Sequence, residues 1–198
     1  MSIHRSLSSS HWLVCQYFQT LRRYCTALSK QKDSASEEAR QDTAVCITLS
    51  VQCVEVFLNV YFRRIADDER FAHVHDELMN DLKNRSFGLS RKIDKWPKLV
   101  FKRKIDKGSV IGRRFSDLQK LRNGLMHFQH DNISIEMPGL AVYGLSDTTA
   151  FDSLTAETAL DALDVAESFA LEIFKLQGVP ETALAGHMRR WTGKWLVT

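Results

Sequence analysis

The sequence predicts an all-α protein, and three observations support this fold class. Nine Gly and three Pro in 198 residues are few, whereas a β-sandwich or barrel needs a turn signal roughly every ten residues. Apolar residues recur at helical spacing over several long segments. A chain of this length with 44% hydrophobic residues can bury a core without disulfides or metal. We expect one domain over residues 1–198, with a core of about 39–177 and a C-terminal tail of 181–198.

The expected architecture is an antiparallel four-helix up-and-down bundle with extra short helices. The first helix should run from His11 to about Lys30. Ser34 and Glu37 then match a capping box, in which each side chain satisfies a free backbone N–H, and they predict a helix to about Ala66. This helix is apolar on nearly every side, as a central buried element is. Its exception is one polar line, either a solvent edge or a functional lining, that consists of Thr48, Gln52, Glu55 and Asn59.

The rest of the chain should form helices around an irregular basic segment. Asp67 and Asp68 are expected to cap a helix to about Leu82, and residues 85–112, with Gly88 and Pro97, should be irregular. A second capping-box pattern at Ser116 predicts a helix over 116–130. Weak alternation over 131–152 admits a small β-hairpin insertion. The last long helix is expected over 155–177, followed by a tail that docks on the bundle or contacts a partner.

Basic residues are concentrated between Lys83 and Lys120, where 13 Lys/Arg stand against three Asp. Such a segment either attracts polyanions or is simply solvated, and the sequence supports both interpretations. Trp96 and Phe101 lie in it and either stack on bases or, as is commoner, anchor the segment to the core. The cationic residues expected to contact a nucleic acid are Lys102, Arg103, Lys104, Arg113 and Arg114.

Several classes of function and location are excluded by the sequence. No Gly-rich phosphate loop supports an ATPase or dehydrogenase, and His73 and His75 point apart on a helix, so we expect no metal and no cofactor. No segment approaches the roughly 18 apolar residues of a membrane span. The cysteines, which lack Cys-x-x-Cys spacing, should be reduced and buried; they are Cys15, Cys25, Cys46 and Cys53. A cytoplasmic protein without a membrane partner is expected.

One short segment carries the residues best suited to chemistry. Arg122, Asn123 and His127 lie within two turns of a predicted helix, with Asn123 and His127 on one side. A guanidinium is a fixed phosphate ligand, and an imidazole exchanges protons near neutral pH. Gly124 in a helix interior costs about 1 kcal/mol against Ala; it is either a tolerated accident or a site of close approach. For His127 the plainer interpretation is a hydrogen-bonded structural histidine.

The segment from Leu121 to His127 resembles the motif of the HEPN superfamily (higher eukaryotes and prokaryotes nucleotide-binding domain). In that motif one helix of a bundle carries an Arg, a polar residue directly after it, and a His a few residues further on. The resemblance covers roughly residues 39–177, with an early helix like Leu49–Asn59 and a closing helix like Leu154–Leu160. It implies a metal-independent endoribonuclease, a toxin or defence effector, whose homodimer places two motifs in one cleft.

The resemblance also implies a role for each residue. His127 would transfer protons during attack of a ribose 2′-hydroxyl on phosphate, Arg122 would neutralise the phosphoryl charge, and Asn123 would orient an oxygen. Glu55 would hydrogen-bond to Arg122 or His127 from the polar line, with Asn59 beside it. Gln129 stands where one toxin branch has Tyr, so regulation by adenylylation is not expected. The alternative is a non-catalytic dimeric module that binds RNA, a nucleotide or a protein partner. For the toxin, the partner to look for is an antitoxin or regulatory protein.

Overall fold

The computed structural model describes residues 9–31, 36–84, 86–126, 133–137, 140–145 and 148–195, with backbone only in the two strands. The prediction of an all-α protein is confirmed. The elements in chain order are α1 (Ser10–Leu28), α2 (Glu37–Ala66), the 3-10 helix η1 (Glu69–Val74), α3 (His75–Lys83), α4 (Leu89–Phe101), α5 (Val110–Met126), β1 (Ile133–Met137), β2 (Leu140–Leu145), α6 (Thr149–Asp152), α7 (Ala156–Gln177) and α8 (Glu181–Thr192).

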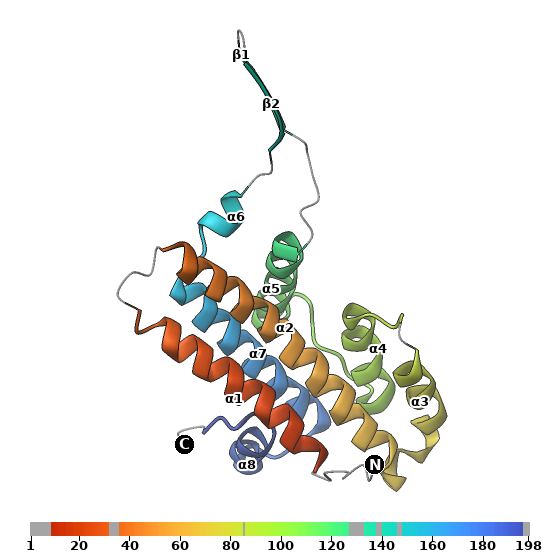
Figure 1. Cartoon of the computed structure of the whole chain (residues 1–198). Coiled ribbons are helices and arrows are strands. Elements are labelled where there is room, and N and C mark those ends of the chain that lie inside the picture. Colours follow the sequence, from red (N-terminus) through yellow and green to blue (C-terminus); the bar gives the residue numbers. More distant parts are fainter. Residues whose placement is uncertain are drawn as a thin grey trace, which may run out of the picture.

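Three long helices, α1, α2 and α7, lie side by side and form the centre of the molecule (Figure 1). Helix α5 packs against α2 and α7, while α3 and α4 flank the second half of α2. Helix α8 packs against α1 and α7 at the end of the bundle that lies away from the hairpin. The tail therefore docks on the helices, as predicted.

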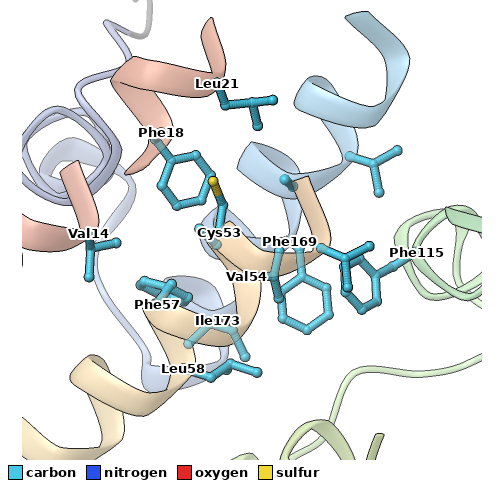
Figure 2. Close-up of a cluster of buried hydrophobic side chains, with 14 of the residues drawn as sticks. Val14, Phe18, Leu21, Cys53, Val54, Phe57, Leu58, Phe115, Phe169 and Ile173 are labelled. Carbon is cyan, nitrogen blue, oxygen red and sulfur yellow. The ribbon is translucent and has the colours of Figure 1, made fainter. Parts of the chain in front are cut away.

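The core is built mainly by α2 and α7, which contain the longest sets of buried residues. Figure 2 shows Phe57 of α2 pointing towards Ile173 of α7, with Phe18 of α1 on the other side. The ring of Phe57 meets the ring of Trp191 edge-on at a centroid distance of 5.8 Å. Aromatic pairs of this geometry stabilise by about 0.5–1.5 kcal/mol beyond their buried area, so α8 is fastened to the core by Trp191.

The start of α2 differs from the prediction. Ser36, not Ser34, is the N-cap, and its side chain accepts a hydrogen bond from the Ala39 N–H at 3.2 Å. Ser34 lies outside the described residues. Helix α7 starts as predicted: Thr155 forms a capping box with Thr158, and the helix ends at Gly178 in the left-handed conformation (φ 83°).

The prediction that residues 85–112 are irregular is wrong, because they contain helix α4. Leu89, Lys92, Trp96 and Val100 recur at helical spacing and are all buried. The Trp96 indole is fully buried, and its Nε1 donates to Asp81 of α3 at 3.1 Å. Trp96 is therefore an anchor for α4 and not a surface on which a base could stack. This burial offsets the cost of Pro97 inside the helix.

Two further boundaries need correction. The predicted start of a helix at Ser116 is wrong, because α5 already begins at Val110 and Ser116 lies inside it. The helix predicted from Asp67 to about Leu82 is divided into η1 and α3, with non-helical backbone at Phe71 (φ −116°). The hairpin is present as a two-stranded antiparallel sheet in which Ile135 pairs with Val142.

The prediction that no segment approaches a membrane span is wrong as far as length and composition go. Within the described residues, α2 is a helix long and apolar enough to cross a membrane, with a mean hydropathy of 1.7 over its best window. More than half of that window is buried against other helices, as expected for the core helix of a bundle. Cys25, Cys46 and Cys53 are buried free thiols as predicted, whereas Cys15 is half-buried.

Candidate functional site

Helix α5 carries the Arg–Asn part of the predicted site and is held in place at its start. Ser109 acts as its cap: the Ser109 hydroxyl accepts from the Gly112 N–H at 3.1 Å and donates to the Asp106 carbonyl at 2.6 Å. A Cβ added at Gly112 would lie 2.2 Å from the Asp106 carbonyl oxygen. Only glycine lets the loop before α5 pack this closely on its first turn.

The middle of α5 is fixed by apolar packing. The Phe115 ring lies 4.5 Å from the ring of Phe169 on α7, and both labelled side chains meet at the side of the core in Figure 2. Phe115 and Leu118 are buried, and Leu121 and Leu125 pack against the same core. These apolar contacts fix the rotation of α5 about its axis just before Arg122, and therefore the direction in which Arg122 projects from the helix.

Arg122 and Asn123 lie near the end of α5 in different environments. Arg122 is half-buried, and its Nε is buried without a hydrogen-bond partner. Among the described residues no carboxylate pairs with its guanidinium. Asn123 and Gly124 are exposed, and no described atom lies within 4 Å of a Cβ placed at Gly124. Gly124 is thus not explained by a close approach from the described part of this chain.

His127 lies outside the described residues, as does Gln129. The proximity of the imidazole to Arg122 and Asn123 rests on their spacing in the sequence and stays a prediction. Met126, the last described residue of α5, is 56% exposed. The helix therefore ends with its Asn123 and Met126 side chains accessible to a ligand or another chain.

The two supporting residues of the predicted site face another part of the molecule. The Glu55 carboxylate accepts a hydrogen bond from Lys92 Nζ of α4 at 2.6 Å, and Lys92 is 8% exposed. Asn59, one turn later, lines a cavity of about 530 Å³ that Arg63 and Lys92 also line. Within the described residues, the structure joins Glu55 to Lys92 and not to Arg122.

The five predicted RNA-binding cations are not equivalent. Lys102 ends α4 in the left-handed conformation (φ 59°) and, like Arg103 and Lys104, is exposed. Arg113 is exposed on the first turns of α5. The Arg114 guanidinium, in contrast, is bound by two carboxylates of α7, Asp161 at 2.6 Å and Asp164 at 3.0 Å; these also raise its pKa.

A cavity of about 380 Å³ lies beside these cations, between α4, α5 and α7. Its floor is apolar and includes Ile93, Phe115 and Phe169, while Ser116 and Arg113 stand at its edge. The two Lys residues at its edge are paired, Lys107 with Asp94 at 2.8 Å and Lys120 with Asp117 at 3.0 Å. Of the cationic residues that line this cavity, Arg113 is thus the one without a carboxylate partner among the described residues.

Sequence reasoning missed the buried carboxylate Glu167. It is 3% exposed on α7 and binds both Arg22 of α1 and Lys194 after α8, the latter at 2.7 Å. Arg22 also donates to the Thr192 carbonyl at 3.1 Å. The signal was present in the sequence, because Glu167 interrupts the apolar run between Val165 and Phe169 at a position that faces the core. This network fastens the C-terminal segment to α1.

No group of three or more His, Cys, Asp or Glu side chains that could hold a metal ion occurs among the described residues. No protein-family model, curated protein or solved structure matches this chain. Function is therefore inferred from the residues of α5 and their surroundings.

Proposed function

We propose that this chain is a metal-independent endoribonuclease of HEPN type that cleaves RNA in a cleft between two copies of itself. The four-helix bundle of the proposal consists of α1, α2, α5 and α7, which pack on one shared core. The proposal includes a cytoplasmic location and a role as toxin or defence effector with a neutralising partner.

The observation that carries the proposal is that the Arg122 guanidinium is partly buried and has no partner among the described residues. Its Nε is buried and unpartnered, and no carboxylate in the described part of the chain neutralises it. A buried polar group without a partner costs about 1–3 kcal/mol and more when charged, and a binding site is one place where this cost is offset, because the ligand supplies the missing acceptor. A phosphate oxygen is such an acceptor, and a guanidinium binds it in bidentate fashion.

The chemistry follows from the residues that flank Arg122. In the proposed reaction His127 removes the proton of the ribose 2′-hydroxyl or protonates the leaving 5′-oxygen, because an imidazole titrates near neutral pH. Arg122 stabilises the negative charge that develops on the phosphoryl oxygens. Asn123, which is exposed beside it, donates its amide to one of these oxygens.

Exposure at the end of α5 supports the proposed dimer. Asn123, Gly124 and Met126 are all exposed, and the absence of a side chain at Gly124 lets a second backbone approach closely. Arg103, Lys104 and Arg113 supply exposed positive charge on the loop before α5 and on its first turns. Salt-dependent contacts of this kind hold an RNA strand without reading its sequence.

The test compares RNA cleavage by the wild-type chain, His127→Ala and Arg122→Ala. His127→Ala should abolish turnover and leave RNA affinity nearly unchanged, because the ring acts mainly in the transition state. Arg122→Ala should impair both turnover and affinity. Matched controls are His73→Ala and Arg23→Ala, which remove the same side chains from exposed positions on η1 and α1 and should leave both quantities unchanged.

The products distinguish the mechanism. They should carry 2′,3′-cyclic phosphate and 5′-hydroxyl ends, cleavage should persist in EDTA, and a 2′-methoxy group at the reacting linkage should block it. Cleavage of the blocked linkage would refute the mechanism. RNA binding that depends on Arg122 without any cleavage would instead favour the non-catalytic module, and loss of neither property in Arg122→Ala would refute both.

A further inference from the structure

A second, smaller cavity lies where the end of α2 meets α8. Its volume is about 160 Å³, and its walls include Tyr61 and Arg64 of α2, Gln177 at the end of α7, and His187, Arg190 and Trp191 of α8. Figure 1 places α8 at the end of the helices away from the hairpin. The cavity is thus separate from the candidate site on α5.

Two guanidiniums in this cavity lack a counter-charge. Asp68 and Arg70 also line it, but the Asp68 carboxylate binds Arg70 at 2.6 Å, so these two charges neutralise each other. No carboxylate pairs with Arg64 or Arg190 in the parts of the chain that the structure describes. The polar contact of Arg64 that the structure does show is to His11 Nδ1, at 3.4 Å.

The pKa values of two neighbouring histidines are lowered by burial and, to a smaller extent, by these positive charges. Burial lowers the pKa of His11, and the charges of Arg64 and Arg190 lower it further. Burial and Arg190 likewise hold the pKa of His187 below its ordinary value. Burial disfavours charge of either sign, whereas the positive potential of Arg64 and Arg190 specifically disfavours a further cation and favours an anion.

Uncharged groups complete the walls of the cavity. The Tyr61 hydroxyl donates to Gln177 Oε1, which leaves the Gln177 amide nitrogen as a donor. His187 carries a buried Nδ1 that has no hydrogen-bond partner. The ring of Trp191, which is 5% exposed, packs against Tyr61 at 5.1 Å and forms a rigid wall. Nitrogen donors and two free positive charges therefore converge on one small space.

We propose that this cavity binds a phosphate group between Arg64 and Arg190. A phosphate dianion neutralises both guanidiniums, whereas a carboxylate neutralises one, and its oxygens accept from several N–H donors at once. The volume is well below the roughly 300–1,000 Å³ of clefts that enclose drug-sized ligands. It suits inorganic phosphate or the terminal phosphate of a larger molecule whose remainder stays outside.

The experiment titrates the full chain with inorganic phosphate, adenosine monophosphate and acetate by calorimetry, and repeats the titration with ring NMR of His11 and His187. Phosphate should bind saturably and shift both histidine signals, and acetate should bind much more weakly. Arg190→Gln and Arg64→Gln should each weaken phosphate binding about tenfold or more, since each removes a charge-assisted hydrogen bond.

Neighbouring arginines supply matched controls. Arg189→Gln and Arg63→Gln make the same charge change one residue away, on the same helices but outside the cavity lining, and should alter affinity less than about twofold. Similar affinity for adenosine monophosphate and inorganic phosphate identifies the phosphate group itself as the ligand. Absence of saturable phosphate binding, or an equal loss in the control variants, would overturn the proposal.

Discussion

Two glycines of α5 provide a sharp test of how this helix is held, because only one of them is packed against backbone. A Cβ at Gly112 would lie 2.2 Å from the Asp106 carbonyl oxygen and 3.0 Å from Lys107 Cα. Real Cβ contacts essentially never fall below 3.0 Å, so Gly112→Ala must push the loop away from the helix. At Gly124 a Cβ would meet no described atom within 4 Å.

The expected free-energy changes therefore have opposite signs. Overpacking costs typically about 1–3 kcal/mol, and in the first helical turn little helix propensity is gained in return. Gly112→Ala should lower the free energy of unfolding by about 2 kcal/mol, which for a chain of this size is a fall in Tm of about 4–8 °C. Gly124→Ala should raise it by about 0.5–1 kcal/mol, since alanine restricts the unfolded chain and favours the helix.

The assay is urea unfolding followed by far-ultraviolet circular dichroism, with thermal unfolding as a second measurement. The slope against urea should be the same for both variants, so that a shifted midpoint reports stability alone. A Gly112→Ala variant as stable as the wild type would refute the packing of the loop on α5. At protein concentrations where the chain is monomeric, destabilisation by Gly124→Ala would refute the conclusion that no described residue packs on this position; a clash with a second chain would act only in the dimer.

Two further predictions concern buried charge and pH. Glu167→Gln should lower the free energy of unfolding by about 2–3 kcal/mol in urea unfolding, because it leaves Arg22 and Lys194 with a neutral partner; Glu172→Gln, on a half-buried position of the same helix, should change it little. The lowered pKa of His187 means that the unfolded chain binds its proton first as pH falls. Stability should therefore be full above the ordinary pKa of 6.5 and decline below it, and His187→Phe should reduce that decline; an unchanged pH profile would contradict the reasoning.

The candidate site was predictable only in part. Arg122 and Asn123 lie on a helix as predicted, because Leu118, Leu121 and Leu125 give that segment a clear apolar face. The partner of Glu55 was not predictable, since it depends on α4 bringing Lys92 alongside α2. Sequence spacing relates residues on one helix, whereas a contact between helices requires knowing how the helices pack.

The sequence by itself determined the helical class, the extents of α1 and α7 and the end of α2, because apolar periodicity, capping residues and glycine stops act locally. Only the tertiary structure decided that residues 85–112 contain a helix, α4. Locally, Pro97 and a row of cations oppose a helix there, but burial of Trp96 and its hydrogen bond to Asp81 outweigh them. It likewise decided which charges are paired: Arg114 is bound by Asp161 and Asp164, whereas Arg122 has no carboxylate partner among the described residues. Such pairing depends on distances between helices that no single helix encodes.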